Sequence, residues 1–232
     1  MHILALDAST EWCSVALGGH DGFKERTEWA GQRHSQLMLP MVEGLLSQAG
    51  TSLARLDGIA FGAGPGSFTG LRIACGIAQG LALGSGLKLV GVSTLAAMAE
   101  VARRRHGARR VLAALDARMH EVYFAAYEHD GKRWGEHIAP AVAAPDAVAL
   151  PGGDGWLAVG NALSAYPTLR SRVAEAVVSF DQAIAPAASA VGVLALERFT
   201  AGEAVPARVA APIYIRHRVA ITTAERAAGV TL

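Results

Sequence analysis

The sequence has few of the features that mark secreted, membrane-spanning or strongly nucleic-acid-binding proteins. Its 232 residues include only two cysteines, Cys13 and Cys75, and carry a formal charge of +1. A chain of this length without a set of paired cysteines is typical of a reducing compartment, so we expect a cytoplasmic protein. The charge balance provides no overall field that would attract DNA or an anionic membrane, and any contact with RNA is expected to be local.

Long hydrophobic runs are also lacking. The most apolar stretch runs from Ile73 to Leu87, and its fifteen residues fall short of the roughly 18 to 20 that span a bilayer. The first residues, MHILALDAST, include no basic leader and reach Asp7 after four apolar positions, which predicts a first strand and no signal peptide. Apolar residues nevertheless make up 52% of the chain, enough to fill a sizeable core.

What the sequence does contain is an internal repeat. Residues 3–22 align without a gap on residues 112–131, at an offset of 109 positions, and eight of the twenty positions are identical. The identical pairs are Ala5/Ala114, Leu6/Leu115, Asp7/Asp116, Ala8/Ala117, Ala16/Ala125, His20/His129, Asp21/Asp130 and Gly22/Gly131. Each copy predicts a strand, a turn led by Asp-Ala, a second strand and an Asp-Gly turn. Two unrelated hairpins that share turn chemistry are the alternative.

The pattern after the first copy alternates helices and strands. We expect a strand over 23–29, helices over 34–49, 69–83 and 94–105, and strands over 56–61 and 88–92. After the second copy the pattern is fainter, with strands over 156–159 and 177–180 and a helix over 187–199. This order predicts an α/β fold of two similar hairpin-led lobes, 1–106 and 107–232, with the ribonuclease H-like architecture of the actin-like ATPase superfamily. The segment from about residue 206 is expected to pack back on the first lobe.

Several strings resemble the bacterial TsaB family. They are LALDASTEWCSVAL, RHSQLMLPMVEGLL, LDGIAFGAGPGSFTGLRIACGIAQGLALG, LVGVSTLAAMA and LDARMHEVYFAAY, and GPGSFTGLR is the most specific part. The resemblance implies a subunit without catalytic activity of its own, which supports the paralogue TsaD in adding threonylcarbamoyl to an adenosine of certain tRNAs. It also implies a TsaE-like ATPase in the complex, tRNA contact through the complex, no cofactor on this chain alone, and ATP or ADP and metal bound mainly through the partner.

The same resemblance indicates that a metal site is missing. TsaD-type sequences carry a metal-binding His-x-x-x-His just after the strand that corresponds to 89–92, and this chain has Thr94 and Met98 at the two positions. A hydroxyl and a thioether do not replace two imidazole ligands of zinc or iron. We therefore predict no metal on this chain.

Residues near the first turn and the glycine-rich loop leave nucleotide binding open. Asp7 stands where this superfamily places a metal-associated carboxylate, but aspartate is also a common turn residue. The loop GAGPGSFTG, between a predicted strand and a helix, matches neither common phosphate-loop motif. Its glycines permit either a tight turn with close helix packing or an anion cradle. The candidate nucleotide or anion contacts are Asp7, Ser9, Thr10, Gly64, Gly66 and Ser67. A small-molecule kinase or a nucleotide-binding regulator is therefore the alternative function.

Two predicted helices have more apolar surface than one core contact requires. Apolar residues of 37–49 cover about 200° of a helical wheel, against roughly 100° for a single buried face. In the second helix, Gly76, Gly80 and Gly84 recur every four residues and permit the close approach of another helix. The predicted interface, with TsaD or with a second copy in a homodimer, is His34, Leu37, Met38, Met41, Val42, Leu45, Arg72, Gly76, Gln79 and Gly80. A wholly interior second helix is the alternative.

The densest basic run lies between the two lobes. It comprises Arg103, Arg104, Arg105, Arg109 and Arg110. Arginines in the last turn of a helix complement its dipole and stay solvated, and contact with tRNA phosphates in the complex is the alternative. No aromatic residues are interleaved with them, so the run does not predict stacking on single-stranded bases.

Overall fold

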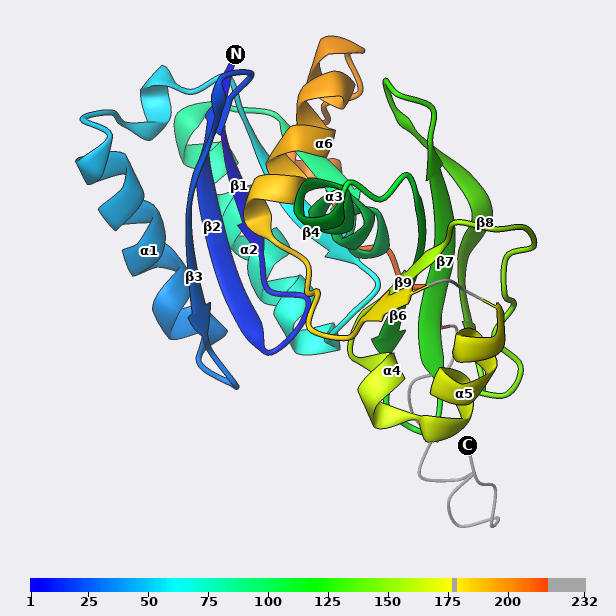
Figure 1. Cartoon of the computed structure of the whole chain (residues 1–232). Coiled ribbons are helices and arrows are strands. Elements are labelled where there is room, and N and C mark those ends of the chain that lie inside the picture. Colours follow the sequence, from blue (N-terminus) through cyan, green and yellow to red (C-terminus); the bar gives the residue numbers. More distant parts are fainter. Residues whose placement is uncertain (177–178, 217–232) are drawn as a thin grey trace, which may run out of the picture.

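Two five-stranded mixed sheets stand side by side in the computed structural model, which describes residues 1–176 and 179–216 (Figure 1). The first sheet has the order β3-β2-β1-β4-β5 and the second has the order β8-β7-β6-β9-β10. The first contains β1 (His2–Asp7), β2 (Trp12–Gly19), β3 (Gly22–Trp29), β4 (Gly58–Gly64) and β5 (Leu89–Ser93). The second contains β6 (Arg110–Asp116), β7 (Val122–His129), β8 (Trp134–Ala143), β9 (Leu157–Val159) and β10 (Ser179–Asp181).

The predicted internal repeat is confirmed by this topology. In each sheet three antiparallel strands are followed by two parallel ones, so the two sheets match strand for strand. Asp7 and Asp116 end the two equivalent strands, and in each case Oδ1 accepts a hydrogen bond from the backbone N–H two residues on, at 3.0 Å and 2.8 Å. The α/β fold of two similar, hairpin-led lobes expected from the sequence is therefore confirmed.

Six helices cover the sheets in the described part of the chain. They are α1 (His34–Gln48), α2 (Phe68–Ser85), α3 (Thr94–His106), α4 (Ala162–Ala165), α5 (Pro167–Ala176) and α6 (Ala188–Thr200). Because side chains alternate along a strand, Leu4 and Leu6 of β1 pack with α1 and α2, while Ile3 and Ala5 pack with α3 and α6 on the opposite face. Helix α3 also packs on the second sheet, whose other face is covered by α4 and α5. Figure 1 shows α3 between the two sheets.

Local signals explain where the long helices begin and end. The hydroxyls of Ser67 and Ser93 accept hydrogen bonds from the first turns of α2 and α3. Gly86 and Gly107 end the same two helices with φ of 73° and 69°, a left-handed conformation that glycine adopts without strain. None of the helices in residues 1–176 and 179–216 is long and apolar enough to cross a membrane.

The predicted lobe boundary needs a correction. Helix α6 was assigned to the second lobe, but it packs on β1, β2 and β4 of the first sheet. The N–H groups of Ala188 and Ser189 donate to side chains of Ser14 and Glu25 in that sheet. The chain therefore returns to the first lobe at about residue 187. Residues 177–178 of the predicted strand and residues 217–232 of the predicted second lobe lie outside the described residues.

After α6 the chain runs along the first lobe as a segment that we call the strap, residues 205–216. It begins with hydrogen bonds in both directions between the backbones of Val205 and Leu89. A short 3-10 helix, η2 (Ala207–Val209), then lies against α2, and the N–H of Ile213 donates to the carbonyl of Ala63 at 2.7 Å. The strap ends beside the gap between the two lobes.

Candidate functional site

A cleft of about 730 Å³ separates the two lobes. Its first-lobe wall is formed by the turn after β1 and the loop before α2, and its second-lobe wall by the turn after β6 and the end of the strap. Of the predicted nucleotide or anion contacts, Ser9, Thr10, Gly66 and Ser67 line this cleft. Asp7 and Gly64 are not among the lining residues.

Asp7 lies beneath the cleft, and its side chain is only 1% exposed. Its Oδ1 accepts hydrogen bonds from the N–H and the hydroxyl of Ser9, at 3.0 and 2.8 Å, while Oδ2 has no partner among the described residues. A Cβ at Gly62 would lie 1.9 Å from Oδ2, so the carboxylate packs directly on β4. Burial raises the pKa of Asp7 to about 6. The assignment of Asp7 as a nucleotide contact is therefore corrected, because it is a buried turn residue.

The glycine-rich loop is packed closely against the first turn. The N–H of Ser67 donates to the carbonyl of Ser9 at 2.7 Å, and the hydroxyl of Ser67 is occupied by the N–H of Gly70. A Cβ at Gly66 would lie 2.3 Å from the same Ser9 oxygen. Gly64 has a φ of 119° and lies against the carbonyl of Ile213. These contacts match the interpretation that the glycines permit close packing. They leave little open space in which the loop could hold an anion.

The second wall presents an arginine that the sequence analysis did not single out. Arg118, Met119 and His120 all have positive φ, between 53° and 60°, which is uncommon outside glycine. This turn directs Arg118 between Asp116 and, across the cleft, Glu11, at 3.0 and 2.7 Å. The Arg118 side chain is 72% exposed, so the ion pair contributes at most about 1 kcal/mol to holding the lobes together.

Arg216, at the end of the strap, contacts the turn that carries Arg118. Its guanidinium donates to the carbonyls of Ala117 and Arg118 and pairs with Glu121. Arg118 lies in one of the family strings, but nothing in the sequence shows that it meets Arg216, and the fold brings the two residues together at the cleft.

The predicted interface residues of α1 belong mostly to the core. Met38, Met41, Val42 and Leu45 are at most 3% exposed and pack on the first sheet. Their spacing of three and four residues forms one buried stripe. His34 is also buried, with Nε2 2.8 Å from the carbonyl oxygen of Thr10, and Leu37 is half-buried at the edge of the stripe. The assignment of these side chains to a partner is therefore corrected, and on α1 the large apolar residue that is exposed is Leu39, at 41%.

Helix α2, in contrast, presents an exposed face. We define the α2 face as Phe68, Arg72, Gly76, Gly80, Leu83 and Gly84, all of which are exposed. Leu83 is 80% exposed, and a Cβ placed on any of the three glycines would meet no atom within 4 Å. The interior-helix alternative is excluded, because an interior helix would have neighbours at these glycines.

Gln79 and Arg72 hold the strap beside the α2 face. The Gln79 side chain donates to the carbonyls of Ala207 and Ala210 at 3.2 and 2.9 Å, so it is corrected from a partner contact to an internal one. The Arg72 guanidinium lies 3.8 Å from the ring centroid of Phe68, and its Nε donates to the hydroxyl of Tyr214 at 3.0 Å. The strap adds the exposed residues Val209, Ile213 and Tyr214 next to the α2 face.

Comparisons with known proteins agree with this fold. The sequence model of the family described as TsaD, tRNA N6-adenosine threonylcarbamoyltransferase, matches residues 27–228. The Escherichia coli K12 protein named "tRNA threonylcarbamoyladenosine biosynthesis protein TsaB" is 43% identical over 226 residues, which cover 95% of this chain and 96% of that protein. The chain belongs to the TsaB family. The solved structure of YeaZ from Pseudomonas aeruginosa has a TM-score of 0.83 and 40% identity, over 92% of this chain and 99% of that one.

This TsaB-family chain also shares a shorter region with the transferase. The tRNA N6-adenosine threonylcarbamoyltransferase of Paracoccus denitrificans is 45% identical over 80 residues, which cover 34% of this chain but only 22% of that protein. The likeness is thus partial.

The two positions expected to replace the metal-binding histidines lie inside the molecule. Thr94 and Met98 start α3 and are fully buried, and Met98 packs in the core of the second lobe. A hydroxyl and a thioether in this setting do not fit a zinc or iron site. The prediction that this chain carries no metal stays a prediction.

Proposed function

We propose that this chain is the non-catalytic TsaB-type subunit of tRNA threonylcarbamoyladenosine biosynthesis and that it binds a TsaD-like paralogue through the α2 face. Membership of the TsaB family supports the process, and the open space beside Gly76, Gly80 and Gly84 supports the surface. Three small residues at four-residue spacing let the backbone of a second helix come close. The apolar side chain of Leu83 is exposed to water in the isolated chain, so a partner that covers it would gain hydrophobic stabilisation.

The proposal that the chain is not catalytic rests on the residues at two places, the positions of the expected metal ligands and the turn beneath the cleft. Thr94 and Met98 offer no ligands for a metal, and Asp7 is buried beneath the cleft rather than exposed in it. The loop Gly64–Ser67 is held against the first turn, which leaves little open space at its backbone for a nucleotide phosphate. We therefore propose that ATP or ADP and metal bind the assembled complex mainly through the partner.

The remaining partners follow from the same proposal. In the absence of the paralogue, the α2 face is proposed to be covered by a second copy of the chain, because a twofold axis lets two identical patches cover each other. A TsaE-like ATPase is proposed to join the complex. Two buried, unpaired cysteines support a place in the cytoplasm.

The test measures binding of the purified chain to the TsaD-family paralogue of the same organism by calorimetry, and self-association by light scattering. Gly80→Leu should weaken both on the order of 100-fold, because the added side chain holds the helices apart. Gly152→Leu is the matched control, since Gly152 also faces open space but lies in the second lobe. Circular dichroism should show that both variants fold.

Leu83→Glu adds a second arm, because it places a charge on the α2 face without filling space. It should weaken binding to the paralogue and leave thermal unfolding nearly unchanged, as Leu83 is 80% exposed. A folded Gly80→Leu protein that binds the paralogue as tightly as the unaltered chain would show that the interface lies elsewhere.

A further inference from the structure

Arg72 lies at one end of the α2 face, and its side chain is held in place by two aromatic rings. Its guanidinium lies 3.8 Å from the ring centroid of Phe68 and 5.9 Å from that of Tyr214, and the two rings are 5.5 Å apart. Its Nε donates to the Tyr214 hydroxyl at 3.0 Å. Phe68 and Tyr214 also line the cleft, so Arg72 stands where the α2 face meets the cleft.

The rest of this guanidinium has no partner in residues 1–176 and 179–216. Neither Nη group donates a hydrogen bond there, and no carboxylate of these residues pairs with Arg72. A guanidinium presents a planar pair of N–H donors that matches the two oxygens of a carboxylate. Because the rings already fix the side chain, less rotamer entropy is lost when such a carboxylate binds.

The exposed charges around α2 are mostly positive. Helix α2 packs against β1, β4, β5, α1, η2 and the short 3-10 helix η1 (Leu53–Arg55). In α2 and these elements one carboxylate is exposed, Glu43 of α1, and the exposed cations are Arg55, Arg72 and Arg208. Asp7 of β1 is buried, and Lys88 and Asp57, which flank these elements, add one charge of each sign. A partner that covers the α2 face therefore meets a surface with a positive excess.

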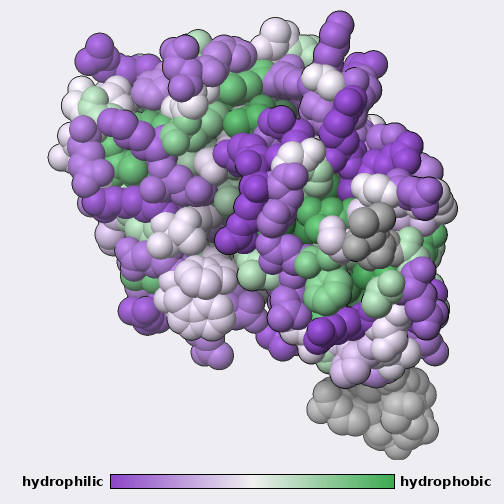
Figure 2. All heavy atoms as spheres, in the orientation of Figure 1, coloured by the Kyte–Doolittle hydropathy of each residue, from purple (hydrophilic) through white to green (hydrophobic). Residues whose placement is uncertain are grey.

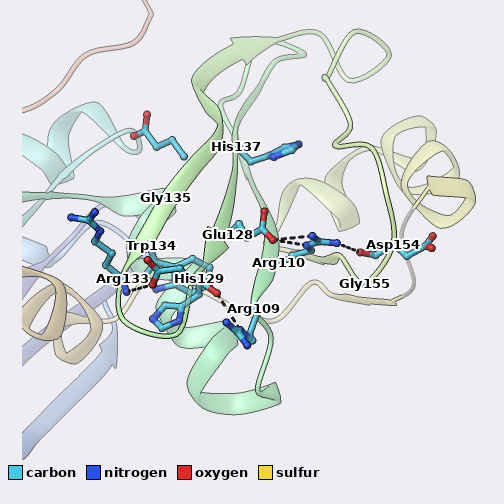
Figure 3. A pocket seen from close by; sticks show the side chains of 12 residues that line it. Arg109, Arg110, Glu128, His129, Arg133, Trp134, Gly135, His137, Asp154 and Gly155 are labelled. Atoms are coloured by element: carbon cyan, nitrogen blue, oxygen red, sulfur yellow. Dashed lines mark hydrogen bonds and ion pairs between the residues drawn. The ribbon is translucent and has the colours of Figure 1, made fainter.

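The hollow of about 800 Å³ in the second lobe differs in this respect. It is formed by the start of β6 and the hairpin of β7 and β8, and it is also rich in arginine (Figure 3). Its lining has four carboxylates for three arginines, so it offers no positive excess. Arg110 there pairs with Glu128 at 2.9 Å, as Figure 3 shows.

The arginine run between the lobes is largely neutralised as well. Arg103 and Arg104 pair with the buried Glu100, and Arg105 pairs with Asp181. These arginines belong to ion pairs within the chain, so they are not the free phosphate contacts that the sequence left open. An exposed guanidinium that is fixed but has no carboxylate is the feature that singles out Arg72.

Arg72 is also in line with the glycines of the α2 face. Figure 1 shows α2 behind the first sheet, and Figure 2 shows that the near side of the molecule is largely hydrophilic, with hydrophobic residues in separate patches. On α2, Arg72, Gly76, Gly80 and Gly84 follow one another at four-residue spacing. A helix that packs on the glycines reaches Arg72 one turn beyond Gly76, about 6 Å along the axis.

We propose that Arg72 binds a carboxylate on a helix of the partner, and that this contact makes the α2 face prefer an acidic partner to a second copy of the chain. The inference rests on the proposed function, in which a paralogue docks on this face. A second copy brings the same surface, and neither α2 nor the strap contains an aspartate or glutamate. The homodimer therefore leaves Arg72 without a carboxylate and is the weaker of the two assemblies.

The test measures the dissociation constants for the paralogue, by calorimetry, and for self-association, by sedimentation, from low salt to about 0.5 M salt. Salt screens the attraction between unlike charges, so binding to the paralogue should weaken several-fold over this range, and self-association should stay the same or tighten. Arg72→Gln should weaken binding to the paralogue roughly 10- to 100-fold and remove most of its salt dependence. The same variant should self-associate at least as well as the unaltered chain.

Three further variants separate charge from packing. Tyr214→Phe removes the hydroxyl that Nε contacts but keeps the ring, so the salt dependence should remain. Arg72→Lys keeps the charge without the planar pair of donors and should recover only part of the binding. Arg109→Gln is the matched control, because Arg109 is an exposed arginine of the second lobe whose Nε donates to one oxygen of the chain, the carbonyl of His129. It should not change binding.

The carboxylate itself can be located on the paralogue. Its exposed aspartates and glutamates are replaced by the matching amides, one at a time, and each variant is measured with the unaltered chain and with Arg72→Gln. One replacement should cost about as much as Arg72→Gln and should add little to it in the double variant.

Two results would overturn the inference. One is a folded Arg72→Gln protein that binds the paralogue as tightly as the unaltered chain, or that binds more weakly with an unchanged salt dependence. The other is a loss of self-association in both Arg72→Gln and Glu43→Gln, because a second copy would then supply the carboxylate. Failure of the proposed function is distinct, since Gly80→Leu would then also leave binding to the paralogue intact.

Discussion

The buried carboxyl group of Asp7 makes the stability of this protein depend on pH in an unusual direction. Burial raises the pKa from 3.8 to about 6 in the folded protein. Between these two values the folded state binds more protons than the unfolded state, so the free energy of unfolding falls as pH rises from about 4 to about 6. The difference corresponds to about 3 kcal/mol, which is lost in full above pH 6.

Asp7→Asn should remove this pH dependence while keeping the shape of the side chain and the hydrogen bond from the N–H of Ser9. We expect the variant to be less affected by pH, so that its stability relative to the unaltered protein improves by about 2 kcal/mol between pH 4.5 and pH 8, since about 1 kcal/mol of the total is already lost at pH 4.5. Asp7→Ala removes the charge but also both hydrogen bonds to Ser9. It should cost about 1–3 kcal/mol at pH 4.5 and be close to neutral at pH 8.

Urea unfolding followed by circular dichroism at several pH values would measure these differences. The comparison of variants cancels the contribution of carboxyl groups such as Asp181, whose pKa is lowered by hydrogen bonds from His106 and Ala183 and by the charges of Arg105 and His106. If the difference between the unaltered protein and Asp7→Asn is the same at pH 4.5 and pH 8, Asp7 ionises as freely in the folded protein as in the unfolded one. The burial argument is then wrong.

Three further predictions concern metal, turnover and the helix α2. Elemental analysis of the purified chain should find no stoichiometric zinc or iron, since Thr94 and Met98 stand at the ligand positions; about one metal per chain would contradict this. The isolated chain should neither hydrolyse ATP appreciably nor modify tRNA, and robust turnover without the paralogue would refute the non-catalytic assignment. Gly70→Ala should destabilise the fold by about 1–3 kcal/mol, because its Cβ would lie 1.8 Å from the carbonyl of Ala8. Gly76→Ala, in open space on the same helix, should instead raise thermal stability by up to about 1 kcal/mol and weaken binding to the paralogue.

Periodicity and turn chemistry were sufficient to predict most of the elements. Strands β1, β2, β6 and β7 were found because the repeat aligned their Asp-Ala turns, and α2 and α3 were found from the alternation of apolar helices and strands, with caps that the structure then showed. The long edge strand β8 and the helices α4 and α5 were missed. Pro140 lies within β8, and an edge strand accepts a proline because one side of its backbone has no partner strand.

Apolar content alone did not show which side of a helix is covered. The sequence of α1 predicted an arc of about 200°, but the sheet buries its central stripe, and Met41 is part of the core. The three glycines of α2 give the same sequence pattern whether the helix is interior or exposed. In the fold, β1, β4 and the strap contact other sides of α2, so the side that carries the glycines is exposed.

The sequence by itself determined the repeated topology, the helix ends and the family, because these depend on residues close together in the chain or on strings that occur as a unit. The tertiary structure alone decided what lies beside what over long separations. It returned α6 to the first sheet, placed Arg118 opposite Glu11, and brought Arg109 to the backbone carbonyl of His129. Such contacts depend on how whole sheets and helices pack, and no local pattern of residue types records that packing.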